Sequence, residues 1–168
     1  MRYWLYKCNT AGGPAGYWGD WLEMVFAKKG PVGWGGHYST RSAEVAKRLD
    51  EDVAAGDVVV AYQTDLKAVV GFCRITSLKA RRTVPGIELQ LQPLAVVNPP
   101  FRIHQHKTGT ILATSFAVNG MVMLRELEHE EMKVLVSLSG APTRVLRGQL
   151  AVGGWRPIRT RGAGLLAS

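Results

Sequence analysis

The stretch Gly56-Asp-Val-Val-Val-Ala-Tyr-Gln-Thr-Asp-Leu-Lys-Ala-Val-Val-Gly-Phe-Cys-Arg-Ile-Thr-Ser77 decides how this chain folds. It contains two runs of β-branched and apolar residues, 58–62 and 68–75, which flank a polar turn around Asp65. This pattern predicts an antiparallel hairpin with a well-buried face, so we expect its strands at the centre of a sheet. Gly71, inside the second strand, predicts a bulge or a close backbone approach.

The sequence before the hairpin predicts one strand, two helices and two glycine-rich loops. The strand covers the alternating aromatic residues 2–8, and the first helix covers 17–27, where apolar residues recur at helical spacing. The loops are predicted at 10–16 and 28–36. The second helix ends before Gly56 and carries one apolar face, formed by Val45, Leu49 and Val53.

Beyond the hairpin the sequence predicts further strands and one clear helix. Alternation and turn signals place the strands at 87–97, 110–116 and 121–124. The first of these should end at Asn98-Pro99-Pro100, because proline cannot donate to a ladder. A helix is expected at 128–138, with Gly140 as its stop. The sum is an α+β chain with five or six mostly antiparallel strands and two or three helices, arranged as a small sheet or open barrel.

The composition is that of a globular protein with an excess of positive charge. The 168 residues include 46% hydrophobic and 20% charged residues, enough to bury one core. Lysine and arginine outnumber aspartate and glutamate by 21 to 13, and the net charge of +8 favours a polyanionic partner. Because part of this excess is local, we divide the chain into a domain at 1–150 and a basic tail containing glycine and arginine at 151–168.

The cysteines and the apolar runs favour a cytoplasmic protein without a membrane partner. Cys8 and Cys73 are single residues inside apolar strands, as expected of buried free thiols in a reducing compartment. No signal-peptide pattern opens the sequence, and no apolar run approaches the roughly 20 residues that span a bilayer.

The strongest chemical feature is the segment Trp34-Gly-Gly-His-Tyr-Ser-Thr-Arg41. Neighbouring glycines cannot cover the indole of Trp34, so it packs elsewhere in the core or forms the wall of a pocket in which a flat ligand stacks. The polar residues that follow lead into a helix N-terminus, which suits anions and hydrogen-bond acceptors. This favours the pocket. For the pair Trp18 and Trp21, helical spacing favours the core over an aromatic cage.

Several segments together resemble an EVE domain, a member of the PUA-like superfamily alongside the YTH readers of methylated adenine. They are Tyr3-Trp-Leu5, Trp34-Gly-Gly36 before a polar run and a helix, Ala55-Gly-Asp-Val-Val-Val-Ala-Tyr62, and Val69-Val-Gly-Phe-Cys-Arg-Ile75. The similarity covers residues 2–150, and Thr108-Gly-Thr-Ile111 and Asn119-Gly-Met-Val122 continue it. The chain departs from the family in having His37-Tyr38-Ser39-Thr40 where a run rich in arginine and asparagine is common.

The resemblance implies a PUA-like open barrel with a pocket for a modified base, such as a modified cytosine or another methylated base, in DNA or RNA. In a duplex such a base must first flip out of its stack, at a cost of a few kcal/mol. Stacking on an aromatic face contributes on the order of 1–3 kcal/mol for any base, so polar groups must supply identity. The candidates for base binding are Trp34, Tyr38, Ser39, Thr40, Tyr62, Gln63 and Trp21.

Phosphate contacts by basic residues would offset the cost of flipping the base. The candidates are Arg41, Lys79, Arg81, Arg82, Arg102 and Lys107. Each neutralised phosphate would add to affinity in a salt-dependent way without reading the sequence.

Two other classes of function stay open on the sequence alone. One is a small hydrolase or nucleotide-processing enzyme that uses His37, or His104 and His106, although no nucleophile elbow accompanies these residues. The other is a regulatory module that binds a free nucleoside. We expect no catalysis and no cofactor. We also expect no metal site, because His104-Gln-His106 lacks further ligands at suitable spacing. Oligomeric state is not indicated.

Overall fold

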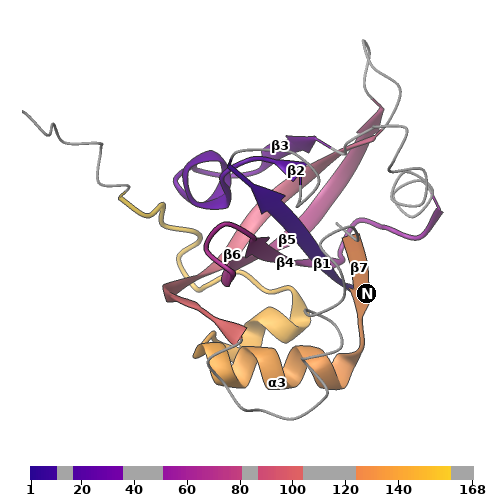
Figure 1. Ribbon diagram of the computed structural model, residues 1–168. Coiled ribbons are helices and arrows are strands. Elements are labelled where there is room, and N and C mark those ends of the chain that lie inside the picture. Colours follow the sequence, from indigo (N-terminus) through magenta and orange to yellow (C-terminus); the bar gives the residue numbers. More distant parts are fainter. Residues whose placement is uncertain (11–16, 36–50, 81–86, 104–123, 160–168) are drawn as a thin grey trace, which may run out of the picture.

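A mixed sheet forms the body of the molecule, and helix α3 (His129–Ser139) packs on one of its faces (Figure 1). The computed structural model describes residues 1–10, 17–35, 51–80, 87–103 and 124–159. Within them the strands are β1 (Tyr3–Asn9), β2 (Tyr17–Trp18), β3 (Val32–Gly35), β4 (Val58–Gln63), β5 (Ala68–Ala80), β6 (Ile87–Phe101) and β7 (Leu124–Leu127).

The strand order confirms the α+β class and the open, mostly antiparallel sheet. The sheet runs β2-β1-β4-β5-β6-β3, and β7 pairs with β1 beside β2. Strand β1 is parallel to β2 and β4, and the other pairs are antiparallel. No ladder between β2 and β3 joins the two ends of this order in the described ranges, so the sheet is not closed there.

The predicted central hairpin is confirmed as β4 and β5, and β5 extends five residues beyond the predicted 75. Hydrogen bonds to Asp57 stabilise the start of this hairpin. The Asp57 carboxylate accepts hydrogen bonds from the Arg2 and Ala54 amides at 2.8 and 3.0 Å and from the Trp4 indole at 2.9 Å. One buried carboxylate therefore fastens the start of β1 to the start of β4.

Gly71 lies at the predicted irregularity in β5. The β5–β6 register shifts between Val69 and Gly71, and a Cβ at position 71 would collide with the Phe26 ring. It would also lie 2.7 Å from the backbone carbonyl oxygen of Ala95 on β6, so the predicted irregularity and the predicted close backbone approach are both found here.

The prediction that the strand from residue 87 ends at Asn98-Pro99-Pro100 is wrong. Strand β6 continues to Phe101, and the Asn98–Pro99 peptide is cis. Val96 pairs with Gly71 and Phe101 pairs with Val69, so the residues between them bulge out of the ladder. Prolines are tolerated there because a bulged residue does not have to donate to the neighbouring strand.

Two predictions in the first 35 residues are also wrong. Instead of a helix at 17–27, the chain forms β2 and a short helix η1 (Leu22–Phe26), in which the Ala27 amide bonds the Leu22 carbonyl. Instead of a loop, residues 32–35 form β3, which pairs with β6. Gly19 interrupts the helical pattern, because its amide donates a hydrogen bond to the carbonyl of Asn9, the last residue of β1.

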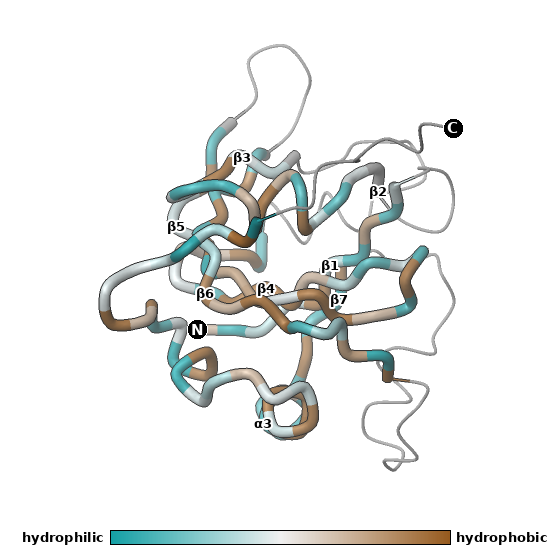
Figure 2. The backbone as a smooth tube through the Cα atoms, turned by 90° about the vertical axis from the view of Figure 1, so that its left-hand side faces the viewer, coloured by the Kyte–Doolittle hydropathy of each residue, from teal (hydrophilic) through white to brown (hydrophobic). Residues whose placement is uncertain are grey.

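The helix predicted at 128–138 is confirmed as α3. Glu128 and Glu131 form a reciprocal capping box at its start, and Gly140 adopts a left-handed conformation at its end. A short 3₁₀ helix, η4 (Thr143–Arg147), follows and was not predicted. Figure 2 shows α3 lying against one side of the sheet. Most of the helix predicted before Gly56 falls outside the described residues, although Val53 is buried as expected.

Two clusters of buried side chains divide the core between the faces of the sheet. The face away from α3 carries the tryptophan cluster, which includes Trp4, Tyr6, Cys8, Trp21, Phe26, Trp34, Cys73 and Ile75. The face toward α3 carries the helix cluster, which includes Leu5, Val58, Val60, Phe72, Leu94, Leu135 and Val145. Alternate residues of β1 and β4 therefore belong to different cores.

Candidate nucleic-acid interface

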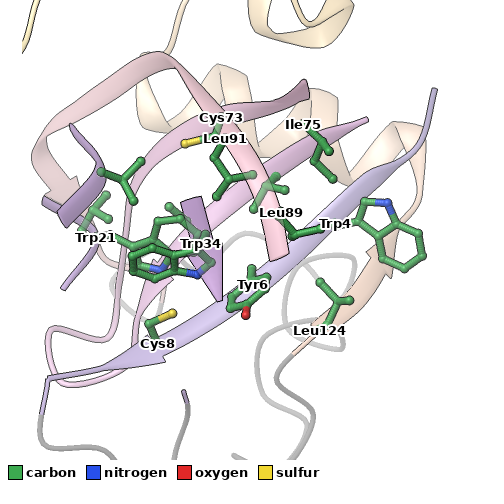
Figure 3. Packing of buried hydrophobic residues seen from close by; sticks show 14 of the residues in the cluster. Trp4, Tyr6, Cys8, Trp21, Trp34, Cys73, Ile75, Leu89, Leu91 and Leu124 are labelled. Carbon is green, nitrogen blue, oxygen red and sulfur yellow. The ribbon is translucent and has the colours of Figure 1, made fainter. Parts of the chain in front are cut away.

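Trp34 and Trp21 form a stacked pair at the centre of the tryptophan cluster (Figure 3). Trp34 lies on β3, and Trp21 immediately precedes η1; their ring centroids are 4.3 Å apart with an interplanar angle of 19°. Tyr6 packs edge-on against both rings. Only 4% of Trp34 and none of Trp21 is exposed, so neither ring offers a stacking face to solvent in this form.

The edge of the Trp34 ring is held by two residues that were not predicted as part of the site. A Cβ at Gly19 would lie 2.8 Å from Cη2 of Trp34, so only glycine leaves room for the indole. Cys8 shares a side-chain hydrogen bond with Trp34, and burial raises the pKa of its thiol well above the ordinary value. The alternation of β1, which places Cys8 on the same face as Tyr6, is the sequence signal for this contact.

Gln63 joins the end of β4 to the chain around Trp21. Its Oε1 accepts a hydrogen bond from the Trp21 amide at 3.1 Å, and its Nε2 donates to the Gly19 carbonyl at 3.1 Å and to Oδ1 of Asp65 at 2.7 Å. The side chain is only 2% exposed. Its amide group is thus fully used within the protein, and it fixes the position of Trp21.

Asp65 supports this arrangement from the β4–β5 turn. Burial acts to raise the pKa of its carboxyl, but hydrogen bonds from Gln63 and from Thr10 outweigh burial and lower it. The carboxylate therefore stays ionised and keeps the Gln63 amide oriented toward Trp21.

Tyr62 is the one described base-binding candidate on the other face of the sheet. It follows a register shift in β4 and packs at the border of the helix cluster. Its partner across the parallel ladder is Lys7, only 4% of which is exposed. Burial, together with the neighbouring charge of Arg125, lowers the pKa of Lys7. The structure thus brings together Trp21, Trp34 and Gln63, while Tyr62 belongs to a separate group.

The indole N–H of Trp21 has no hydrogen-bond partner in the part of the chain that the structure describes. Its Nε1 is buried and is one of two such unpaired side-chain atoms among the residues described, the other being Nε of Arg144. A buried donor left unpaired costs about 1–3 kcal/mol, so folded proteins seldom retain one.

Two of the phosphate-binding candidates can be placed. Lys79 is exposed near the end of β5, and Arg102 is exposed just after β6. Arg102 borders a hollow of about 290 Å³ with Leu66, Pro99 and Pro100. The remaining candidates for the site lie outside the described residues, namely Tyr38, Ser39, Thr40, Arg41, Arg81, Arg82 and Lys107, together with His37, His104 and His106.

A second hollow borders the helix that follows Trp21. It has a volume of about 370 Å³, and Leu22, Val96 and Ile158 are among the residues that line it. Trp155, three residues before Ile158, also contacts η1 and the chain after it: its ring packs against Phe26 and its indole donates to the Lys28 carbonyl at 3.1 Å. The start of the predicted C-terminal tail therefore packs against the tryptophan cluster.

Among the residues described, no three histidine, cysteine, aspartate or glutamate side chains lie together as a metal site would require. Cys8 and Cys73 are both free and buried. No helix in the described part of the chain is long and apolar enough to cross a membrane.

Comparison with solved structures identifies the fold. Rpa0253 from Rhodopseudomonas palustris has a TM-score of 0.62 at 18% identity, covering 83% of this chain and 94% of its own. Human THYN1 in complex with 5-methylcytosine-containing DNA has a TM-score of 0.60 at 13% identity, covering 84% and 99%. The YTH domain of Zygosaccharomyces rouxii MRB1, in complex with N6-methyladenosine RNA, has a TM-score of 0.50 at 11% identity, covering 82% and 86%.

At the level of sequence, no family model and no curated protein matches the chain. The DUF55 domain of human thymocyte nuclear protein 1 matches in structure with a TM-score of 0.60. The resemblance to EVE domains is therefore confirmed for the fold: the chain has the PUA-like fold of the DUF55 (EVE) and YTH domains.

Proposed function

We propose that this protein binds nucleic acid and holds a modified base, flipped out of its stack, at the Trp21–Trp34 pair. The proposal is supported by the fold shared with a protein bound to methylcytosine DNA and with one bound to methyladenosine RNA. The net charge of +8 also favours a polyanionic partner. The protein recognises the base and carries out no reaction on it.

The observation that carries the proposal is the unpaired indole N–H of Trp21 in the centre of an aromatic pair. The edge of a base carries ring nitrogens and carbonyl oxygens, each of which accepts a hydrogen bond. A base held against the rings would therefore satisfy a donor that the protein leaves buried and unpaired. Its methyl group would meet the apolar surface of the same cluster.

A base can lie between the two rings only if they separate. Sandwiching it would require centroids about 7 Å apart, twice a contact distance of about 3.5 Å. The observed separation is 4.3 Å. Trp34 sits between Gly33 and Gly35 on a four-residue strand, and Trp21 precedes a single short helix. Each ring–base contact contributes on the order of 1–3 kcal/mol, which offsets the lost ring–ring contact.

The remaining site residues take different roles in this proposal. Tyr38, Ser39 and Thr40 follow Trp34 closely in the sequence and are proposed to contact the edge of the base. Gln63 acts through Trp21, because its own amide is engaged. Tyr62 is proposed to contact a flanking nucleotide, since it belongs to the opposite face. The phosphate contacts are proposed to come from Arg41, Lys79, Arg81, Arg82, Arg102 and Lys107.

The test is a binding screen by fluorescence anisotropy. Oligonucleotides of DNA and of RNA carry one 5-methylcytosine, 5-hydroxymethylcytosine or N6-methyladenine, and each is compared with its plain counterpart. We expect at least one modified oligonucleotide to bind more tightly than the plain one. Equal affinity across all pairs would refute the proposal.

Two controls separate the other classes of function. If the free modified nucleoside binds as tightly as the oligonucleotide that contains it, the protein is a small-ligand module. If the bound oligonucleotide or a nucleotide is converted to product, and the conversion requires a divalent metal, the protein is an enzyme. We expect weaker binding of the free nucleoside, because it lacks the phosphates on which the basic side chains act.

A further inference from the structure

A group of three arginines lies on the α3 side of the sheet, away from the tryptophan cluster. Arg74 is on β5, while Arg144 and Arg147 are on η4. In a 3₁₀ helix the side chains at positions i and i+3 eclipse one another, so Arg144 and Arg147 project from the same side of η4. Val145, between them, is buried in the helix cluster. Figure 1 shows η4, in light orange, beside α3.

Contacts between η4 and the sheet bring Arg74 into this group. Arg74 pairs in register with Val58 and Gln92, and its Nη1 donates to the carbonyl of Gly148, the residue that ends η4, at 3.4 Å. Arg144 donates from Nη2 to the carbonyl of Leu94 on β6 at 3.3 Å. Arg74 thus reaches the end of η4, where Arg147 precedes Gly148 in the chain, and we call these three residues the η4 arginine surface.

This surface has no neutralising acid among the residues that the structure describes. None of the three guanidinium groups has an ion pair with a carboxylate there, and Nε of Arg144 is buried without a partner. The sequence contains no aspartate or glutamate after Glu131. The acids at the start of α3 are already engaged, since Glu130 pairs with Lys133 and Glu131 bonds the Glu128 amide.

The chemistry of the surface selects a phosphate-bearing partner. A guanidinium group presents a planar fork of donors that matches two oxygens of one phosphate, and backbone carbonyls hold two of these forks in place. Arg74 and Arg147 are exposed, so their remaining donors can reach a ligand. A row of such cations suits a polymer with a regular series of charges better than a single anion.

We infer that the η4 arginine surface binds the phosphate backbone of nucleic acid, independently of base identity, as a second contact on the face opposite the Trp21–Trp34 pair. The inference rests on the proposed function only in taking nucleic acid as the partner. Because the two sites lie on opposite faces of the sheet, the strand that enters the base site has to pass around its edge. The arginines contribute affinity, and the tryptophan pair contributes the preference for a modified base.

The test measures binding of a plain 20-base-pair duplex and a plain 20-nucleotide single strand, using whichever binds more tightly. The variant R74Q/R147Q removes two exposed charges of the surface. The control R2Q/K133Q removes two charges that are already paired with carboxylates. Both variants lower the net charge by two, and thermal unfolding verifies that both remain folded.

We expect R74Q/R147Q to weaken binding about tenfold at low salt, and the control to weaken it less than twofold. The slope of log affinity against log salt should fall by about 1.8 for a duplex or about 1.4 for a single strand, as two phosphate contacts require. Equal losses in the two variants, or an unchanged slope, would overturn the inference and leave an acidic protein partner as the alternative.

The modified-base preference distinguishes this inference from the proposed function. R74Q/R147Q should lower affinity for modified and plain oligonucleotides by the same factor, because the surface does not touch the base. Its effect on binding should add in free energy to that of a substitution at Trp21, since the sites share no partner. If no oligonucleotide shows a preference while the slope still falls, the arginine surface stands and the base site fails.

Discussion

At the scale of the residue, Trp21 unites two properties that seldom coincide, complete burial and an unpaired donor. Its ring stabilises the fold by stacking on Trp34, while its unpaired N–H destabilises it. The two properties can be separated by a substitution that retains an aromatic ring and removes the donor.

Trp21→Phe should change stability by less than about 1 kcal/mol, because the gain from removing a buried donor without a partner is opposed by the small cavity that the phenyl ring leaves. Affinity for the modified-base oligonucleotide should fall about tenfold, the loss of one hydrogen bond of about 1.4 kcal/mol. Denaturant unfolding and anisotropy titration measure the two effects. A loss of stability without any loss of affinity would show that Trp21 serves only the core.

Trp34→Ala should destabilise the fold by about 3–5 kcal/mol, because a buried indole stacked on Trp21 would be replaced by a cavity. A pocket wall open to solvent would have predicted little change. The measurement is the midpoint and slope of urea unfolding. Trp34→Phe is the matched control: it should recover most of this stability, which allows binding to be measured on a folded protein.

At the scale of the element, the sequence correctly predicted the strands and the helix whose formation depends on local turns, caps and apolar spacing. The hairpin at 56–77 and the helix at 128–138 carry their own turns, caps and apolar spacing, and both formed as predicted. Strand β3 was mistaken for a loop because its glycine content is explained only by its partners. Gly33 and Trp34 pair in register with Gln90 and Leu89 of β6, a partner that the local sequence does not show.

The site shows the same limit. Aromatic content marked Trp34 and Trp21 as candidates, but their stacking depends on β3 and η1 meeting beside β1. Gln63 was recognised at the end of a strand, whereas its bonds to Trp21 and Gly19 depend on where β2 returns to the sheet. The sequence therefore indicates which residues are candidates for the site. How their side chains are oriented depends on tertiary pairing, which the local sequence does not show.

The C-terminal segment is an element without regular secondary structure that still stabilises η1. Trp155 packs on Phe26 and bonds the Lys28 carbonyl, and the Ile158 amide bonds the Phe26 carbonyl at 3.2 Å. Trp155→Ala should therefore lower stability by about 1–2 kcal/mol, as expected for a half-buried aromatic side chain. Val152→Ala, at a fully exposed position nearby, is the control and should have no effect on thermal unfolding. Equal unfolding temperatures for the two variants would contradict this role.

At the scale of the whole molecule, a buried aromatic site on one side of a sheet cannot reach a base that is paired inside a duplex. The base must leave its stack, and flipping is cheapest where pairing is already weak. For the same modified base, a mismatch opposite it should therefore increase affinity relative to the matched duplex. A mismatch retains both phosphate backbones, so it changes only the cost of flipping.

The fluorescence of 2-aminopurine at the target position provides an independent measurement. It should rise when the protein binds, because the base is no longer quenched by its neighbours. An unchanged fluorescence, together with no gain from the mismatch, would mean that the base stays stacked. In that case the protein would contact nucleic acid by its charged surfaces alone.

Because Cys8 is buried beside Trp34, the rate at which its thiol is alkylated measures how often the site opens. An alkylating reagent attacks only an accessible, ionised sulfur, and burial both shields Cys8 and raises the pKa of its thiol. Cys73 lies equally buried within the β5 ladders, so its alkylation reports the unfolding of the sheet as a whole. If the Trp34 region opens by itself, Cys8 reacts faster than Cys73, and a bound modified oligonucleotide protects Cys8 selectively. Identical rates for the two sulfurs would mean that the site is accessible only from the unfolded chain.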